Sequence, residues 1–526
     1  MTDHVALANQ AALISALAAS LSKQSTRFAA FETHISHVLV ADDDAYKFKK
    51  AVRFDFLDFS TLDARRFYCE EELRLNKRLA PDIYLEVVAV MLEHGKPVFG
   101  GAGEPVEYAI RMRAFEQEAL WDERLRKARL TGEEVDALAE LLAHFHQAAA
   151  IAPVSSPWAG KEALDAVADE TLNQIAASVQ DEQDKEKAAR LLRWEAQQRI
   201  HLSETFAERK SRGMIRECHG DLHSGNILTR GGRVEAFDCI EFSDRLRWID
   251  VMNDMVFVCM DLRFRRQPGL AARFLNRYLE ATGDYHGLAV MRYYEVHRAL
   301  IRCKIALLRA AQENIDKEEW RARRQQGRDY LAFACARIAP VHPAIMITHG
   351  FSGCGKSTVA RQLVEECDAI QLRSDVERKR MHGLALSTRG EAGLYERGVT
   401  QQTYEQLAAL ARQVASSGAR VIVDATFLKR DQRTRFQRLA AELEIPFLIL
   451  DIRASQDVMK SRIAERERRN VDASDAGLAV LEAQLASHEP LTADELTQAI
   501  VIDSERALDR TTIDGILDKI CTRLMQ

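Results

Sequence analysis

The chain has 526 residues, of which 79 are acidic and 73 are Lys or Arg, and its formal net charge is -6 at pH 7. At about 100–200 residues per domain, this length predicts two to four domains. The charges are spread along the chain, which excludes a global electrostatic attraction to nucleic acid or to anionic membranes. With 47% hydrophobic and 29% charged residues, the composition excludes a fibrous or largely disordered protein.

The cysteines and the start of the chain indicate where the protein is expected to reside. Nine cysteines contain no CxxC pair and no ligand-like spacing, which favours reduced thiols in the cytoplasm over a disulfide framework. Residues 1–29 have apolar residues at helical spacing and no basic segment before them, so they predict an amphipathic helix rather than a signal peptide. No run of about 18 apolar residues occurs, so we expect no membrane partner. The oligomeric state stays unknown.

Changes in hydrophobic pattern divide the chain. Strand-like runs give way to long helical patterns, and Pro340 and Pro343 cannot continue a helix, which places a boundary near 338–343. Beyond it, short apolar runs alternate with helical patterns, as is typical of a parallel sheet with crossover helices. The predicted parts are an N-terminal helix, a first domain, a linker helix and a second domain, at residues 1–29, 30–325, 326–342 and 343–526.

A phosphate-binding loop opens the second domain. The segment GFSGCGKS fits the pattern G-x-x-x-x-G-K-[ST], and it follows the apolar run AIMIT and precedes the helical run STVARQLVEE. In such a loop backbone N–H groups surround a polyphosphate, the lysine supplies a charge to its terminal oxygens, and the serine hydroxyl can bind Mg²⁺. The context disfavours a chance turn. The nucleotide site is predicted at Gly350, Ser352, Gly353, Cys354, Gly355, Lys356, Ser357 and Thr358.

Carboxylates and arginines that could complete this site follow the later strands. Asp424 closes the run RVIVD and is the expected Mg²⁺ ligand beside Ser357, with a helix N-cap as the alternative. Asp375 ends IQLRSD, where ligands of open α/β sheets bind, and it could accept a hydroxyl proton or cap the next helix. Arg462 and Arg466 share one helical face and could reach a transferring phosphoryl group from a lid, or belong to a solvated helix.

These residues resemble the small P-loop kinases related to the polynucleotide kinase, gluconate kinase and zeta-toxin groups, over about residues 343–526. The resemblance implies an α/β domain with a five-stranded parallel sheet, a lid, and phosphoryl transfer from ATP to a hydroxyl. Ala425 stands where motor ATPases place a hydrolytic glutamate, so a kinase is favoured over a molecular motor. The loop is specific for a nucleotide, whereas nothing after it specifies the acceptor.

A second constellation lies in the first domain. The segment HGDLHSGNIL begins at His219, places Asp221 and Asn226 five residues apart, and is followed by Asp238 in VEAFDCIEF. Phosphoryl transfer needs one carboxylate that takes the hydroxyl proton, and an amide oxygen and a second carboxylate that hold Mg²⁺. Asp221, Asn226 and Asp238 match these three roles. His219 is expected to brace the loop and His223 to lie near the substrate, rather than to bind zinc.

Most of residues 30–320 resembles the aminoglycoside phosphotransferase and choline kinase superfamily, itself similar to protein kinases, whose motif HGDxHxxN occurs here letter for letter. The resemblance implies an α+β protein-kinase-like fold and the three roles given above. It places the structural aspartate of the family at Asp254, with Asp250 as the rival. It also places THISH, at 33–37, where a loop would cover the phosphates, although the glycine motif of protein kinases is missing.

The resemblance also implies a lysine for ATP and a glutamate that holds it. The segment ADDDAYKFKKAV predicts a β-hairpin whose second strand carries this lysine; Lys49 is preferred, and Lys47 on the same face stays an alternative. The glutamate should come from the following helix, where Glu72 is favoured over Glu70 and Glu71.

The leading interpretation is a tandem kinase, in which each domain binds ATP and Mg²⁺ and transfers the γ-phosphate to a small-molecule hydroxyl, in a sugar, an amino alcohol or a nucleotide-type acceptor. The chain resembles bacterial bifunctional aminoglycoside phosphotransferase/ATP-binding proteins. The competing interpretation is an ATP-binding regulatory or sensor protein with one active kinase or NTPase domain. Residues 317–330 interleave arginines with Trp320 and Tyr330, yet a solvated helix is favoured there over a nucleic-acid interface. A redox role of Cys218 or Cys239 stays open.

Overall fold

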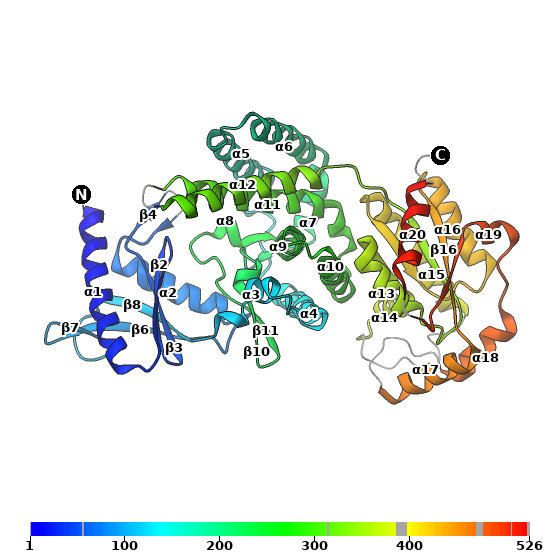
Figure 1. Ribbon diagram of the computed structural model, residues 1–526, viewed down its shortest axis with the longest axis horizontal. Helices are drawn as coiled ribbons and strands as arrows, with labels where there is room; N and C mark the ends of the chain where they lie inside the picture. The colour runs from blue at the N-terminus through cyan, green and yellow to red at the C-terminus, as the bar shows by residue number, and fades with distance from the viewer. Residues whose placement is uncertain are drawn as a thin grey trace. The chain divides into compact units, whose positions relative to one another are not determined.

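The computed structural model describes residues 2–54, 57–312, 315–385, 397–469, 477–506 and 508–522. No helix in these ranges is long and apolar enough to cross a membrane. The chain forms two compact units, each composed of two segments (Figure 1). The first unit comprises Met1–Asp261 and Tyr293–Ala334, and the second comprises Leu262–Arg292 and Cys335–Gln526.

A six-stranded antiparallel sheet opens the first unit, in the order β1-β2-β3-β8-β6-β7. Its strands in chain order are Phe28–Glu32 (β1), Ser36–Ala41 (β2), Asp44–Lys49 (β3), Tyr84–Glu93 (β6), Lys96–Phe99 (β7) and Glu107–Arg113 (β8). Strand β3 pairs with β2 as the predicted hairpin, with Val38 opposite Lys47 and Ser36 opposite Lys49. Because side chains alternate along a strand, Lys47 and Lys49 leave β3 on the same face.

Helices cover this sheet and continue the unit. Helix α1 (Thr2–Gln24) buries Ile14 and Leu17 against Leu39 and Phe48 of the sheet, because its apolar residues recur on one side. Helix α2 (Leu62–Asn76) packs on β3, β6 and β8. The further helices with residues in this unit are Trp121–Arg126 (α3), Gly132–Ala148 (α4), Lys161–Ser178 (α5), Glu182–His201 (α6), Ser203–Ser211 (α7), Asp244–Arg247 (α8), Val251–Phe264 (α9), Leu288–Ala310 (α11) and Lys317–Arg337 (α12).

The described residues of the first unit also form three two-stranded ribbons and two 3-10 turns. One ribbon is a hairpin with Ile227 opposite Ala236, and it carries the segment between the predicted Asn226 and Asp238. The elements are Arg53–Phe54 (β4) with Leu57–Asp58 (β5), Ile215–Glu217 (β9) with Trp248–Asp250 (β12), Ile227–Arg230 (β10) with Arg233–Ala236 (β11), Gln117–Ala119 (η1) and Ser224–Asn226 (η2).

The second unit is built on a five-stranded sheet in the order β14-β15-β13-β16-β17, and every neighbouring pair is parallel. The five-stranded parallel sheet expected from the sequence is thereby confirmed. The strands are Ile345–His349 (β13), Ala369–Arg373 (β14), Arg420–Asp424 (β15), Phe447–Arg453 (β16) and Ala499–Asp503 (β17). Strands β13, β15 and β16 are almost wholly buried, as expected for continuous apolar runs covered on both faces.

Helices from two parts of the chain pack on this sheet. Residues 262–292 contribute α10 (Pro268–Thr282), whose Asn276 side chain donates to the Ala369 carbonyl at 2.8 Å and accepts from the Gln371 N–H at 2.6 Å. The other elements of the unit are Tyr285–Gly287 (η3), Lys356–Cys367 (α13), Ser374–Met381 (α14), Arg397–Ser416 (α15), Arg430–Glu442 (α16), Gln456–Arg469 (α17), Leu478–Ser487 (α18), Ala493–Thr497 (α19) and Arg510–Thr522 (α20).

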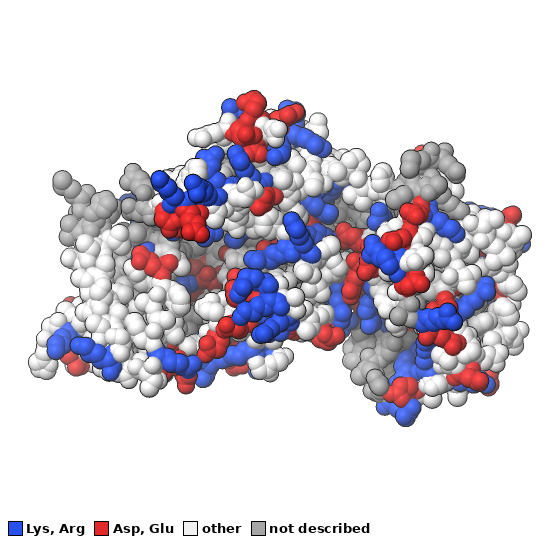
Figure 2. All heavy atoms as spheres, viewed as in Figure 1, with Lys and Arg blue, Asp and Glu red and all other residues white. Residues whose placement is uncertain are grey.

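Helix α12 carries the residues that invited a nucleic-acid interpretation. It buries Tyr330 and Leu331, while Trp320 is 41% exposed and carries the Arg324 guanidinium over its ring at 5.2 Å. On the face drawn in Figure 2, basic and acidic side chains are interspersed rather than gathered in one basic stripe.

Candidate active sites

The first site is centred on a cluster that joins β3 to α2. The Lys47 Nζ lies 2.8 Å from the Glu72 Oε1 and also pairs with Asp238. Lys49 pairs with Glu72 and with Glu241. Burial acts to lower the pKa of Lys47, but Asp238 and Glu72 outweigh it and hold this pKa well above its usual value. Burial acts to raise the pKa of Glu72, but the two lysines bring it to about 2.

The neighbours of Glu72 on α2 have other partners. Glu70 accepts from Arg66 at 2.9 Å and Glu71 accepts from Arg74 at 2.6 Å. Glu72 is fully buried and also accepts from the Tyr84 hydroxyl at 3.1 Å. The structure therefore brings Glu72, which the sequence favoured, to the lysines.

The two lysines differ in what they reach beyond Glu72. Lys47 pairs with Asp238, whose side chain is 43% exposed and therefore open to a ligand. Lys49 is 1% exposed, and its Nζ lies 5.4 Å from the centre of the Phe59 ring. A lysine that orients a triphosphate must reach the accessible, metal-binding end of the site. The geometry favours Lys47 for this role and a structural one for Lys49, in the reverse order of the sequence preference.

Separate replacement of the two lysines tests this division. Lys49→Met leaves the buried Glu241 carboxylate without its ion pair, so we expect a loss of about 3–5 kcal/mol of stability. Lys47→Met leaves Glu72 paired with Lys49 and Asp238 in contact with solvent, so the fold should persist while transfer at the first site falls. Thermal unfolding and transfer rates of both variants are the measurements. Equal destabilisation of the two variants would contradict the division.

The predicted base and metal ligands meet in the loop at 219–228. The Asn226 Nδ2 donates to the Asp221 carbonyl at 3.0 Å and to its Oδ2 at 3.1 Å. This use of the NH₂ group leaves the amide oxygen as the atom of Asn226 that suits a cation. Asp238 follows β11 with a φ of 66°, a left-handed conformation that Asp tolerates better than most residues. An amide oxygen and an accessible carboxylate are oxygen ligands that fit Mg²⁺.

The electrostatics of Asp221 suit a proton acceptor. Its Oδ2 lies 3.4 Å from the His223 Nε2, while the His223 Nδ1 accepts from the Gly225 N–H at 3.0 Å. Burial acts to raise the pKa of Asp221, but His223 and Arg302 outweigh it and hold this pKa below its usual value. The carboxylate is therefore ionised at neutral pH, as a general base must be.

Asp254 holds the backbone that precedes the base. Its Oδ2 accepts from the His219 N–H at 2.9 Å, and its Oδ1 accepts from the Gly220 N–H at 2.8 Å. The His219 side chain in turn lies 2.9 Å from the Phe237 carbonyl and accepts from the Asp221 N–H at 3.2 Å, so it braces the loop as expected. These contacts give Asp254 a structural role in holding the loop.

The rival Asp250 has a different partner. Its two carboxylate oxygens accept from the Arg209 Nε and Nη2 at 2.6 and 2.7 Å, and both side chains are at most 1% exposed. Asp250 also accepts from the Met252 N–H at 2.9 Å, at the start of α9. A bidentate pair of this kind is expected to support the fold rather than the reaction.

We expect Arg209→Met to destabilise the first unit by about 3–5 kcal/mol, because the Asp250 charge stays buried without its guanidinium. The double variant Arg209→Met with Asp250→Leu removes both charges and should recover part of this loss. The midpoint of thermal unfolding, followed by circular dichroism, is the measurement. An unchanged midpoint in the single variant would contradict the expectation.

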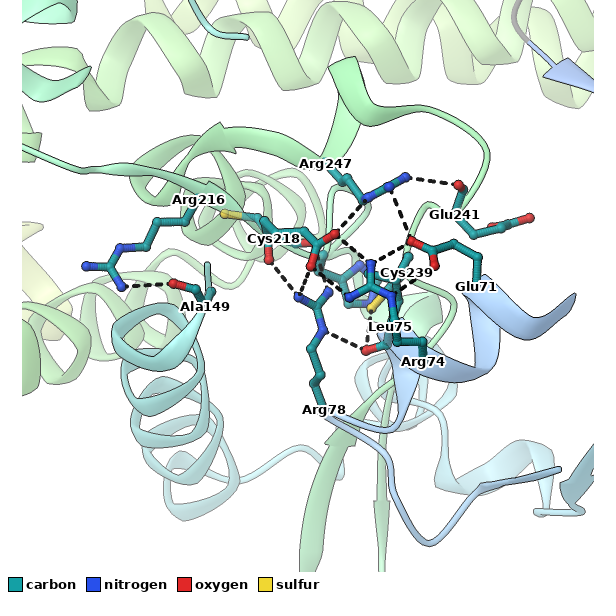
Figure 3. A network of polar contacts seen from close by, with 12 residues as sticks. Glu71, Arg74, Leu75, Arg78, Ala149, Arg216, Cys218, Cys239, Glu241 and Arg247 are labelled. Carbon is teal, nitrogen blue, oxygen red and sulfur yellow. Dashed lines mark hydrogen bonds and ion pairs between the residues drawn. The ribbon is translucent and has the colours of Figure 1, made fainter. Parts of the chain in front are cut away.

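A network without any sequence motif links α2 to the strand before the catalytic residues. Glu217, at the end of β9, accepts from Arg74 at 2.7 Å, Arg78 at 3.1 Å and Arg247 at 3.3 Å. Arg247 also donates to the Glu241 carbonyl at 2.9 Å (Figure 3). The three arginines thus fasten the helix that carries the lysine-binding glutamate to the catalytic segments. Sequence reasoning missed them, because their common partner is far away in the chain.

Cys218 and Cys239 flank the catalytic positions but are buried, at 0% and 1% exposure. Burial raises the pKa of both thiols well above the usual value. A protonated and inaccessible thiol reacts poorly, so the structure indicates packing roles for both cysteines.

The second site contains the predicted phosphate loop between β13 and α13. Gly350 and Gly353 have φ values of 148° and 83°, which side chains rarely adopt. A Cβ at Gly350 would lie 2.5 Å from the Ile452 carbonyl, and one at Gly353 would lie 2.6 Å from the Met459 carbonyl. The loop therefore requires glycine at both positions. Lys356, the first residue of α13, donates from its Nζ to the Phe351 carbonyl at 2.8 Å and so lies across the loop.

Asp424 and Ser357 meet beside this loop. Asp424 ends β15, is 4% exposed and is hydrogen-bonded to Ser357, while Gln371 donates to its Oδ2 at 2.9 Å. Burial raises the pKa of Asp424 above its usual value. A hydroxyl and a carboxylate at the loop are oxygen donors that fit Mg²⁺. The N-cap alternative for Asp424 is wrong, because the next helix begins at Arg430 and its N-cap is Lys429.

Asp375 lies in the first turn of α14, directly after β14. Its Oδ1 accepts from the Arg378 Nη1 at 2.7 Å, and its charge acts on Asp424 at the end of the adjacent strand. The N-cap of α14 is Arg373, which instead donates to Glu280 at 2.9 Å. The structure thus places Asp375 at the carboxyl edge of the sheet without the capping role.

The two predicted arginines lie on α17. The Arg462 Nη2 donates to the Ser504 carbonyl at 2.7 Å, and a Cβ at Gly355 would lie 3.0 Å from the Arg462 Nη1. Arg462 is therefore next to the phosphate loop. Arg466 follows one turn later and is half-buried, and residues 470–476, where the expected lid continues, lie outside the described residues. Ser504, which also donates to the Cys354 carbonyl, was not predicted, because it follows β17 without a motif.

Comparisons with known proteins agree with these two sites. The uncharacterized proteins Rv2004c of Mycobacterium tuberculosis and Mb2027c of Mycobacterium bovis are each 30% identical to the chain over 479 residues, which cover 86% of this chain and 89% of theirs. The chain belongs to their family. Residues 64–292 match the model of the phosphotransferase enzyme family, and residues 345–491 match that of an AAA domain. The two regions of this family member support phosphotransferase activity and nucleotide binding.

Solved structures give weaker likenesses. A choline/ethanolamine kinase family protein from Mesorhizobium loti is 13% identical, with a TM-score of 0.37, and covers 59% of this chain and 92% of its own. A sugar kinase from Janibacter sp. HTCC2649 is 22% identical, with a TM-score of 0.27, and covers 35% of this chain and 95% of its own.

Proposed function

We propose that the chain is a two-site, ATP-dependent phosphotransferase, in which each region transfers the γ-phosphate to a hydroxyl of a small molecule. The observation that carries the proposal is that each unit assembles a lysine, a candidate base and oxygen ligands for a cation. At the first site these are Lys47, Asp221 and the pair Asn226 and Asp238. At the second site the phosphate loop with Lys356 lies beside a hydrogen-bonded serine and aspartate.

At the first site, Glu72 holds the Lys47 ammonium in place for the triphosphate, and Asp221 receives the proton of the acceptor hydroxyl at its carboxylate. The acceptor oxygen forms a new bond to the γ-phosphorus while the bond to the ADP oxygen breaks. Asn226 and Asp238 would hold Mg²⁺, which when bound neutralises part of the triphosphate charge. Hydrogen bonds from the His219 N–H to Asp254 and from the Asp221 N–H to the His219 side chain hold the backbone around Asp221 in place.

At the second site, the backbone N–H groups of the loop and Lys356 bind the polyphosphate at the N-terminus of α13. Ser357 and Asp424 would hold the cation there. Asp375 is the proposed proton acceptor, and Arg462 and Arg466 are the proposed stabilisers of the transferring group.

The test follows labelled γ-phosphate from ATP onto a panel of sugars, polyols, amino alcohols and nucleosides, with the full chain. We expect label in acceptors of two kinds, one lost in Asp221→Asn and the other in Lys356→Ala. The double variant provides the background. Release of inorganic phosphate alone, at a rate that no acceptor changes, would contradict the proposal and favour an ATP-binding regulatory protein.

A further inference from the structure

A cavity of about 760 Å³ opens in the first unit, between the turn that joins β1 to β2 and helices α11 and α12. Thr33 and His34 line it from the turn, Arg302 and Arg309 from α11, and Arg323 from α12. Small-molecule sites occupy about 300–1,000 Å³, so the cavity has room for a metabolite. The turn is the segment that the family resemblance places over the phosphates.

Basic side chains outnumber acidic ones in the lining. Two carboxylates, Glu32 and Glu319, accompany the cations Lys50, Arg302, Arg309 and Arg323. Glu32 is paired with Lys50 at 2.5 Å, whereas Glu319 is shared between Arg309 at 3.0 Å and Arg323 at 3.6 Å. One carboxylate cannot balance two guanidinium groups, so this part of the cavity keeps a positive charge.

Arg302 adds a charge that the lining does not balance. Within the described parts of the chain it forms no ion pair, and its Nε is buried without a hydrogen-bond partner, although the side chain is hydrogen-bonded to Tyr330. A buried, unpaired donor on a cation is costly unless a ligand or water completes it. Burial lowers the pKa of His34, and Arg309 and Lys50 lower it further, so this ring is neutral at pH 7.

Helix α11 also connects the cavity to the reacting groups. Arg302 lines the cavity from this helix, and Arg298, one turn earlier, donates to the Gly220 carbonyl at 2.8 Å. Gly220 directly precedes Asp221 in the chain. The helix that lines the cavity is thus hydrogen-bonded to the loop that carries the proton acceptor of the proposed mechanism.

We propose that the acceptor of the first site is an anionic hydroxyl compound, a sugar or polyol that carries a phosphate or a carboxylate. Arg302, Arg309 and Arg323 bind the anion, because guanidinium groups match the oxygens of both anions in bidentate geometry. This inference deepens the proposed function of the first site and rests on it. Phe54 and Ile305, 43% and 44% exposed in the same lining, supply apolar surface for the carbon skeleton.

The charge of the cavity separates this acceptor class from its rivals. A cationic amino alcohol or amino sugar would meet three arginines and a lysine, and no uncommitted carboxylate of the described lining would offset them. An uncharged sugar could accept from the Arg302 Nε but would leave the positive charge of the lining unbalanced. An anion satisfies this donor and offsets the positive charge at once.

The binding test uses the full chain with Lys356→Ala, so that only the first site responds. Saturating AMP-PNP fills the nucleotide site, so that the test compounds cannot bind there. Calorimetry compares the binding of glucose, glycerol and ribose with that of their phosphates, of gluconate and of glucosamine. The sugar phosphates and gluconate show whether the cavity prefers a phosphate or a carboxylate. We expect at least one anionic compound to bind about tenfold or more tightly than its uncharged parent. Arg302→Gln and Arg309→Gln should each remove this preference, whereas Arg321→Gln, exposed on α12 outside the lining, should keep it.

The possible outcomes distinguish a failure of the anionic-acceptor inference from a failure of the proposed phosphotransferase function. Transfer of label to glucose or glucosamine in preference to the anionic forms overturns the inference and leaves the phosphotransferase intact. Anion binding that AMP-PNP abolishes, or that both arginine variants leave unchanged, also overturns it. If label reaches no acceptor, the proposed function fails, and the calorimetric preference still decides whether the cavity selects anions.

Discussion

Replacing Asp221 by Asn is expected to lower phosphoryl transfer at the first site by about 10²- to 10⁴-fold, because an amide cannot take the acceptor proton. The fold should persist, since the oxygen of an asparagine side chain can still accept from the Asn226 amide as the carboxylate does. The rate of acceptor labelling, measured with Lys356→Ala to silence the second site, gives the effect. Binding of ATP should change little, because Asp221 does not belong to the lysine cluster.

The matched control is Asp63→Asn, which removes an exposed carboxylate from the first turn of α2. It changes the net charge by the same amount and should leave the rate unchanged. If Asp221→Asn transferred phosphate as fast as this control, the base would have to be another group, and His223 would be the first to test.

Motifs whose chemistry requires close spacing were predictable from the sequence. The phosphate loop and the segment from His219 to Leu228 appear in the structure as expected, because each places its groups within one turn or one short loop. The parallel sheet was predictable for a similar reason, since five apolar runs alternate with helical patterns. In these cases the neighbours that matter in space are also neighbours in the chain.

The burial of individual side chains and their pairing with residues far away in the chain were not predictable in the same way. Lys47 and Lys49 share a face of β3, so periodicity cannot tell which one reaches Asp238 and which one is enclosed with Glu241. That difference is set by how α2 and the segment after β11 pack on the sheet. Glu217 illustrates the same limit, since its arginines come from α2, the turn after it and α8.

The basic cavity shows what such distant pairing adds to function. Its arginines come from α11 and α12, its histidine from the turn before β2, and no spacing in the sequence relates them. The arginines of α12 looked like a solvated surface in the sequence, yet Arg323 lines the same cavity as Arg302. In the proposed mechanism, acceptor choice depends on residues that carry no motif, whereas nucleotide binding depends on residues that do.

Replacing Lys356 by Ala is expected to lower transfer at the second site by about 10²- to 10³-fold, the effect of removing one fixed donor to developing negative charge. Among the described residues, the lysine donates to the Phe351 carbonyl and to the Cys354 sulfur at 4.0 Å, so its loss breaks no ion pair there and the unit should stay folded. Labelling is measured with Asp221→Asn present.

The matched control is Lys460→Ala, which removes an exposed lysine from α17. Equal rates in the two variants would contradict a phosphate-binding role for the loop, because Lys356 is its only cationic side chain among residues 350–357.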